Sequence, residues 1–145
     1  MDTTISLKAT GPEAKEAVEE SFARIQELDR LASAQRPDSD LGKLKAAAGK
    51  DYVQVDPAVY EMIDFAKTYS EKSQGAWDIT TGVITDLWGI GTDNQRIPSD
   101  EEIVAAESLV NYKDILLRPE DHSVKLAKAG MSIDLGGIAK GYAVD

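Results

Sequence analysis

The residues best suited to chemistry lie near the end of the chain, in the segment 130–142. This segment reads as a short buried strand that ends in Asp134, a turn through Gly136 and Gly137, and a new helix that carries Lys140 in its first turns. Glycine lets the backbone approach a ligand closely. The unpaired N–H groups and the positive dipole end of a new helix attract an anion. The pattern is therefore typical of a phosphate-binding turn, to which Lys140 adds a positive charge and Asp134 a group that holds a ligand or helps to place a metal.

The same spacing also fits an ordinary strand-to-helix turn, in which the glycines serve only close packing. The dinucleotide-binding fingerprint, with its three spaced glycines, is absent, and so is the Gly-Lys-Ser/Thr of a P-loop. Both interpretations stay open on spacing alone.

A second candidate is the segment 75–82, in which Ala76, Trp77, Asp78 and two threonines lie between two glycines. An aromatic ring beside hydrogen-bonding groups suits the ring system of a flavin or an adenine. The alternative is purely structural: the glycine ends one helix, Trp77 enters the core, and Asp78 caps the next helix.

Other polar residues predict little chemistry. The only histidine, His122, lies in a charged turn, and the chain has no cysteine, so neither a disulfide nor a transition-metal cluster is indicated. Ser132 has no nearby base in the sequence, which leaves a hydrolytic triad unsupported. Asp38 and Asp40 are more typical of helix caps than of an acid–base pair.

Composition predicts one globular domain. The chain has 145 residues, of which 42% are hydrophobic and 29% charged. Its net charge of −10, with no basic cluster, argues against binding to nucleic acid or to an anionic membrane surface. No apolar run approaches the roughly 20 residues of a membrane span, and the first residues form no signal peptide. The protein is thus expected to be cytoplasmic, or exported by a signal that has been removed.

Periodicity predicts strands and helices in mixed order, and hence one α+β domain with a mixed sheet and packed helices. The predicted strands are 3–9, with Ile5 and Leu7 inward, 52–55, 115–117, 123–126 and the one that leads into Asp134. The predicted helices span 13–34, about 40–48, 56–74, a short stretch within 79–91, and 99–109. In the two longest helices, the residues expected to face inward are Ala14, Val18, Phe22, Ile25 and Leu28, then Val59, Met62, Ile63, Ala66 and Tyr69.

Five blocks, taken in order, resemble the FAD:protein FMN transferase family, also called the ApbE or thiamine biosynthesis lipoprotein family. They are Met1-Asp2-Thr3 and the segments 36–41, 75–80, 87–89 and 134–145. The resemblance implies an ApbE-like fold, incomplete at the C-terminus. It implies an enzyme that splits FAD, attaches FMN to a threonine of a partner flavoprotein and releases AMP, with Mg²⁺ bound. It also implies a location on the outer face of the cytoplasmic membrane.

By the same resemblance, one set of residues contacts FAD, and the carbonyl of Gly137 binds Mg²⁺. The nucleophile would be the partner's threonine, so none is expected here. The FAD contacts would be Met1, Ala76, Trp77, Asp78, Asp134 and Lys140.

Three departures from the family pattern are visible. Lys45 stands where many members have asparagine, and Gln35 stands where some place an aromatic ring. The family's second half, with an Asp and a Thr that complete the magnesium site, is missing. Residues 1–145 are therefore expected to be the N-terminal part of the transferase domain, inactive alone and prone to self-association, with a homodimer as one form.

Three other functions compete with FMN transfer. Some family members hydrolyse FAD to FMN and AMP, so an FAD pyrophosphatase is one alternative. A flavin-binding module without turnover is the second, and a plain interaction domain whose motifs serve packing is the third.

Overall fold

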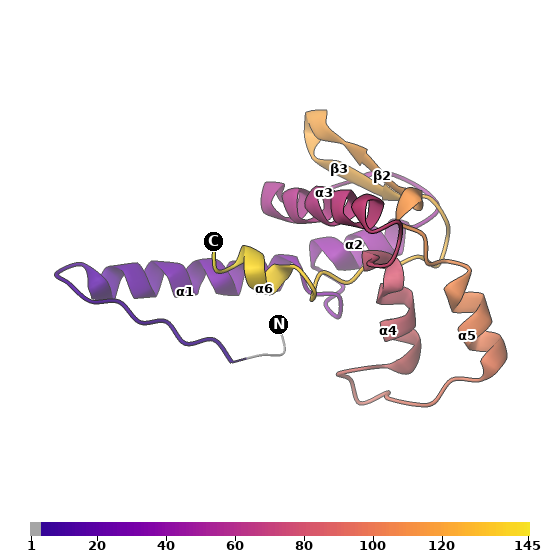
Figure 1. Ribbon diagram of the computed structural model, residues 1–145, viewed down its shortest axis with the longest axis horizontal. Coiled ribbons are helices and arrows are strands. Elements are labelled where there is room, and N and C mark those ends of the chain that lie inside the picture. Colours follow the sequence, from indigo (N-terminus) through magenta and orange to yellow (C-terminus); the bar gives the residue numbers. More distant parts are fainter. Residues whose placement is uncertain (1–3) are drawn as a thin grey trace.

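The computed structural model describes residues 4–145, so Met1 lies outside the described part of the chain. A long helix and a short one extend from a body of helices and a small sheet, and two further helices form an arm (Figure 1). In chain order the helices are α1 (Ala14–Leu31), α2 (Asp40–Ala47), α3 (Pro57–Lys72), α4 (Gly82–Trp88), α5 (Asp100–Glu107) and α6 (Ala139–Tyr142). The strands are β1 (Val53–Gln54), β2 (Ile115–Arg118) and β3 (Ser123–Leu126), and short 3-10 turns span Ile79–Thr81, Tyr112–Asp114 and Pro119–Asp121.

The core lies between the sheet and the helices α2 and α3. The strands pair antiparallel in the order β1-β3-β2, and Val124 of β3 faces both Val53 and Leu117. On α3, Val59, Ile63 and Ala66 are fully buried at the spacing of one helical face. The α+β class is confirmed, and all strand pairs in residues 4–145 are antiparallel where a mixed sheet was predicted.

Side-chain caps lie at the starts of three helices, and at α2 the cap is Ser39 in place of Asp38 or Asp40, which the sequence favoured. The Ser39 hydroxyl accepts from the N–H of Gly42, and Asp56 accepts from Ala58 with Pro57 as the first helical residue. Ser99 and Glu102 form a capping box at α5. These local signals explain why the predicted and observed starts of these helices agree.

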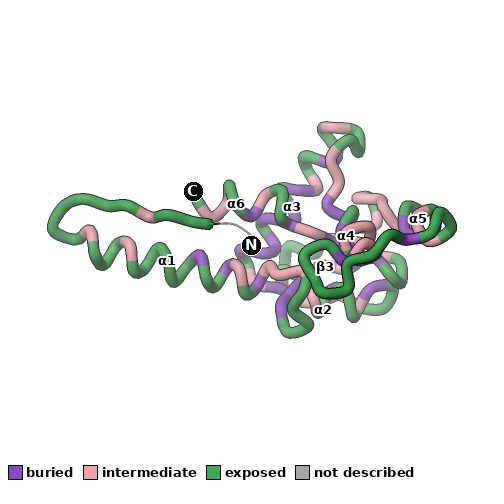
Figure 2. The backbone as a smooth tube through the Cα atoms, turned by 90° about the horizontal axis from the view of Figure 1, so that it is seen from below, coloured by how far each residue is buried: buried purple, intermediate pink, exposed green. Residues whose placement is uncertain are grey.

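The N-terminal region differs from its prediction. Residues 4–10 form no strand and run back along α1, and Phe22, predicted inward, is 48% exposed (Figure 2). The alternation of Ile5 and Leu7 is compatible with a strand, but no strand pairs with these residues within the described part of the chain. Only the C-terminal part of α1, with Ile25, Leu28 and Leu31, is buried.

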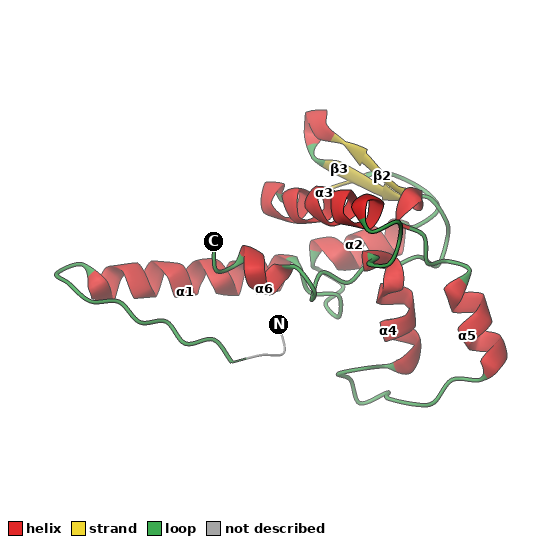
Figure 3. Ribbon diagram, viewed as in Figure 1, coloured by secondary structure: helices red, strands yellow, loops and turns green. Residues whose placement is uncertain are grey.

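Two further predictions need correction. Tyr69 is 48% exposed and packs against Phe65, which is also on the outer face of α3, with ring centroids 4.8 Å apart. The segment 131–135 is mostly buried but forms no strand, and it appears as a loop between β3 and α6 (Figure 3). It is held instead by single bonds, such as that from the N–H of Asp134 to the carbonyl of Ile79 at 2.9 Å.

Within residues 4–145, no helix is both long and apolar enough to cross a membrane.

Candidate functional site

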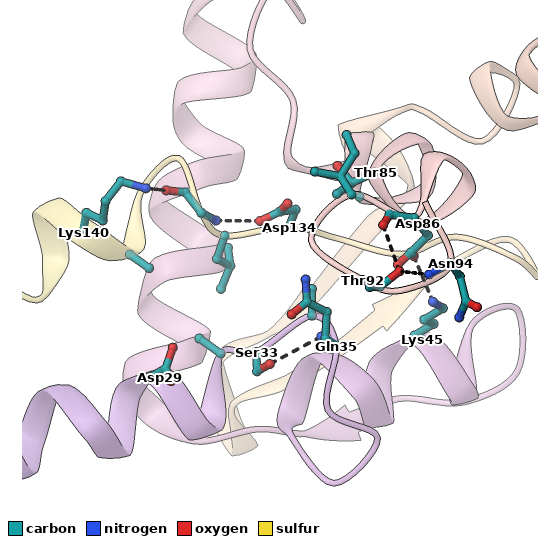
Figure 4. A pocket seen from close by; sticks show the side chains of 18 residues that line it. Asp29, Ser33, Gln35, Lys45, Thr85, Asp86, Thr92, Asn94, Asp134 and Lys140 are labelled. Atoms are coloured by element: carbon teal, nitrogen blue, oxygen red, sulfur yellow. Dashed lines mark hydrogen bonds and ion pairs between the residues drawn. The ribbon is translucent and has the colours of Figure 1, made fainter. Parts of the chain in front are cut away.

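A pocket of about 420 Å³ lies where four parts of the chain meet. Its walls are the end of α1 with the following residues 32–35, Lys45 of α2, the helix α4 with the loop after it, and the segment 134–140. Figure 4 shows Lys140 and Lys45 at opposite sides of this pocket, with Asp134 between them. The structure thus places two of the predicted site residues, Asp134 and Lys140, in one cavity.

The turn after Asp134 is built by its own side chain. Asp134 Oδ1 accepts from the N–H of Gly136 at 2.7 Å, and the ammonium of Lys140 donates to the carbonyl of Gly136. Within residues 4–145, the Lys140 ammonium forms no ion pair. Lys140 thus contributes a positive charge to the lining of the pocket.

Helix α4 forms the opposite wall. Gly82, Thr85, Asp86 and Gly89 all line the pocket, and their spacing places them on one face of the helix. Gly89 has a positive φ of 64°, which lets the chain turn sharply out of the helix.

Gly82 determines how closely α4 approaches the segment that contains Ile133 and Asp134. A Cβ at this position would lie 2.6 Å from the carbonyl carbon of Ile133 and 2.9 Å from the nitrogen of Asp134. Those atoms are backbone and have little room to move, so only glycine permits this approach. Gly82 thereby sets the distance between Asp134 and α4.

Asp78 performs a structural task in this conformation. Its Oδ1 accepts from the N–H and the hydroxyl of Thr80 at 2.8 and 2.7 Å, and its Oδ2 accepts from the N–H of Tyr112 at 2.8 Å. Asp78 is thus the N-cap of the turn Ile79–Thr81, and it ties that turn to residues just before β2. Ala76 is exposed beside it.

Trp77 and Gly137, sixty residues apart in sequence, are brought together. A Cβ on Gly137 would lie 3.4 Å from Trp77 Nε1 and 3.5 Å from its Cζ2. Trp77 is half-buried and also packs against the core. Neither residue lines the pocket of Asp134 and Lys140; Gly137 borders a neighbouring groove of about 670 Å³ with α1, α3 and α6.

Tyr142 also lines this groove, and its hydroxyl donates to Glu61 of α3 at 2.7 Å. The hydrogen bond to Glu61, together with burial, raises the pKa of Tyr142 to about 12. This bond fastens α6 to α3.

The described residues do not by themselves complete a magnesium site, because no group of three or more acidic or histidine side chains gathers within residues 4–145. Mg²⁺ prefers oxygen ligands in octahedral geometry.

Several pocket residues were not predicted as site residues. They come from the end of α1, from α4 and from the loop after it, and include Asp29, Thr85, Asp86, Thr92 and Asn94. For α4 a signal was present, since a polar and glycine stripe recurs at three, four and seven residues from Gly82. The loop residues gave none, because only the folded chain brings them to the pocket.

Comparison with known proteins gives consistent results. The model of the ApbE family matches residues 1–145. A FAD:protein FMN transferase of Treponema pallidum (strain Nichols) is 36% identical over 143 residues, covering 95% of this chain and 40% of the relative. One from Klebsiella pneumoniae (strain 342) is 32% identical over 124 residues, covering 86% of this chain and 39% of the relative.

Solved structures share the fold. The ApbE protein of Thermotoga maritima MSB8 matches with a TM-score of 0.85 and 32% identity over 95% of this chain and 45% of that one. The apo flavinyl transferase ApbE of Pseudomonas stutzeri matches with a TM-score of 0.80 and 30% identity over 95% of this chain and 46% of that one. The chain thus spans less than half the length of these relatives, and the predicted ApbE-like fold is confirmed for the part present.

Proposed function

Because the chain belongs to the ApbE family, we propose that the whole protein transfers FMN from FAD to a threonine hydroxyl of a partner flavoprotein. The threonine oxygen forms a bond to the phosphorus of the FMN half, the bond from that phosphorus to the AMP oxygen breaks, and AMP leaves with the hydroxyl proton. The observation that carries this proposal is the pocket that holds both Asp134 and Lys140 between α4 and the end of α1.

In this proposal, the chain's own residues bind and orient the dinucleotide. Lys140 attracts the diphosphate, while Asp134 holds the Gly136 turn in the conformation that presents Lys140. Trp77, with Ala76 and Asp78 next to it in the chain, lies against Gly137 of this turn. There, we propose, Trp77 contacts a ring of FAD and the carbonyl of Gly137 is one Mg²⁺ ligand. Met1 is proposed as a further FAD contact.

Magnesium, when bound, would neutralise charge on the diphosphate. Its remaining ligands are proposed to come from sequence outside residues 1–145, since the described residues supply no cluster of acids. The chain alone is therefore proposed to be inactive. The apolar groove beside α6 and the exposed Phe65 are proposed to favour self-association, including a homodimer, when that sequence is absent.

The proposed place of the reaction is the outer face of the cytoplasmic membrane, with the cytoplasm as the alternative. Fractionation of cells that express the complete reading frame would decide between them.

The test of transfer uses the protein expressed from its complete reading frame, incubated with FAD, Mg²⁺ and an acceptor flavoprotein. We expect flavin fluorescence on the acceptor band after denaturing electrophoresis, and none when the acceptor threonine is replaced by alanine. Release of FMN and AMP with no labelled acceptor would identify an FAD pyrophosphatase instead. FAD binding with neither product would identify a binding module, and no FAD binding would leave an interaction domain.

The site assignment is tested in the same assay with Asp134→Asn, Lys140→Ala and Gly137→Val. We expect the first two to lower FAD affinity or turnover, and Gly137→Val to impair magnesium-dependent turnover more than folding, measured as the thermal midpoint. Normal turnover by Gly137→Val would refute the metal assignment. Unchanged KM and kcat in Lys140→Ala would show that Lys140 is an ordinary solvent-exposed helix residue with no role in FAD binding or turnover.

A further inference from the structure

Three residues from three parts of the chain form a polar network at the pocket wall opposite Lys140. Asp86 Oδ2 on α4 forms an ion pair with the ammonium of Lys45 on α2 at 2.9 Å. The same oxygen accepts a hydrogen bond from the hydroxyl of Ser132 at 2.5 Å. Ser132 is only 4% exposed. The carboxylate of Asp86 is thus anchored from the core side and holds Lys45 on the pocket side.

The position of Lys45 distinguishes it from the other lysine of α2. Lys45 lines the pocket, whereas Lys43 does not and pairs with Asp40 at 2.8 Å. Figure 4 shows the Lys45 side chain reaching toward Asp86, across the pocket from Lys140. The two lysines have comparable exposure, at 50% and 52% of their side chains, so Lys43 is a matched control.

The charges around the pocket make an additional cation necessary for an anionic ligand. The described lining residues carry three carboxylates, on Asp29, Asp86 and Asp134, against two ammonium groups, on Lys45 and Lys140. The lining is thus net negative by one charge even with both lysines counted, and Lys45 reduces the repulsion that a phosphate would meet if Lys140 were the only cation in the lining.

The ammonium of Lys45 can turn from Asp86 toward a ligand at a small cost in free energy. The members of the Lys45–Asp86 pair are 50% and 32% exposed, and ion pairs so open to water are weak. The four-carbon stem of lysine is flexible, so the ammonium can turn from Asp86 toward a ligand oxygen. The bond from Ser132 remains to hold Asp86 when Lys45 turns.

We infer that Lys45 is a specificity-determining residue, which binds a phosphate group of the pocket's ligand at the end opposite Lys140 and is positioned there by Asp86 and Ser132. The inference rests on the proposed function, because it takes FAD as the ligand. It predicts that Lys45 contributes to binding of the charged dinucleotide and contributes nothing to binding of an uncharged flavin.

The test compares FAD with riboflavin, which has no phosphate, in the protein expressed from its complete reading frame. Dissociation constants are measured by flavin fluorescence at low and high salt for the wild type, Lys45→Met, Lys45→Arg and the control Lys43→Met. Since a charge-assisted bond to phosphate is lost, we expect Lys45→Met to weaken FAD binding about tenfold, with riboflavin affinity unchanged and a smaller salt dependence. Lys45→Arg should retain most of the FAD affinity, and Lys43→Met should match the wild type.

The outcomes separate this inference from the proposed function. If the wild type binds FAD and Lys45→Met binds it as tightly as Lys43→Met does, the role of Lys45 is refuted and the proposed function stands. If Lys45→Met weakens FAD and riboflavin equally, Lys45 only supports the pocket wall, and the inference is again refuted. If the wild type binds no FAD, both proposals fail. Thermal midpoints of all variants show whether each one is folded.

Discussion

Asp78 and Asp134 each lie in a short segment with a glycine on either side, at Gly75 and Gly82 and at Gly130 and Gly136, but they have different roles in this molecule. Asp78 accepts three hydrogen bonds and holds two distant turns together. Asp134 accepts one hydrogen bond, from the N–H of Gly136 two residues further along the chain, and its side chain lines the pocket. The same local pattern therefore gives a structural acid in one region and a pocket acid in the other. The difference lies in whether other backbone N–H groups surround the carboxylate.

The largest expected effect is that of Asp78→Ala. It leaves the N–H groups of Thr80 and Tyr112 without their acceptor, and such losses cost about 2–4 kcal/mol of unfolding free energy in total. Urea denaturation measures it. Asp134→Ala is the matched control and should cost about 1 kcal/mol or less, since a single local bond is removed. Equal costs for the two variants would remove the distinction between these aspartates.

Gly82→Ala tests the contact between the start of α4 and the backbone of Ile133 and Asp134. The added methyl group would meet the backbone of Ile133 at 2.6 Å, so we expect a loss of about 1–3 kcal/mol from overpacking and a displaced Asp134. Calorimetry measures the loss, and FAD affinity reports the displacement. Gly141→Ala is the control: its Cβ would meet nothing within 4 Å, and it lies in α6, where alanine is favoured. A Gly82→Ala protein as stable as Gly141→Ala would contradict the close approach.

Trp77→Ala tests whether Trp77, the residue before Asp78, contacts FAD. If Trp77 stacks on a ring of FAD, its loss should weaken FAD binding by about 1–3 kcal/mol, as removal of a base-stacking aromatic does. Titration of FAD into the full-length protein measures this, with thermal midpoints to account for lost packing against the core. An unchanged FAD affinity would assign Trp77, like Asp78, to the fold alone.

The smallest effect concerns the attachment of α6, which follows Asp134. The folded-state pKa of Tyr142, about 12, lies above the ordinary value of 10. Its bond to Glu61 is therefore fully present below pH 10, and its contribution is lost as the pH rises from 10 to 12. The pair is partly open to water, so we expect about 0.5 kcal/mol or less. Urea denaturation at pH 9 and pH 11 measures it; Tyr142→Phe should remove this pH dependence, and an identical dependence in that variant would refute it.

Local signals in the sequence predicted much of the body of the fold. The Asp56-Pro57 cap, the Ser99 capping box and the hairpin of β2 and β3 each depend on neighbours within a few residues. The prediction of a strand at residues 3–9 was wrong for the described residues because a strand needs a partner, and alternation does not supply one. Phe22 and Tyr69 follow the helical period but are about half exposed, because the period does not say how much of a helix face is covered.

The site was only partly predictable for a similar reason. Asp134 and Lys140 could be found because the glycine turn between them is a local pattern. The Lys45–Asp86–Ser132 network joins residues far apart, and each of the three has an ordinary surface or core explanation in the sequence. For Asp78 the capping role was one of the two predicted alternatives, and only its bond with Tyr112, 34 residues away, was hidden.

The bond from the Asp134 amide to the carbonyl of Ile79 also has a kinetic consequence. Together with the Ser132–Asp86 bond, which spans 46 residues, it closes the pocket across long loops, and such contacts form late in folding because loop closure is entropically costly. The amide of Asp134 should therefore gain protection from solvent exchange after the amides of α3 during refolding. Its rate of deuterium uptake then reports how often the ligand side of the molecule opens while the core stays folded.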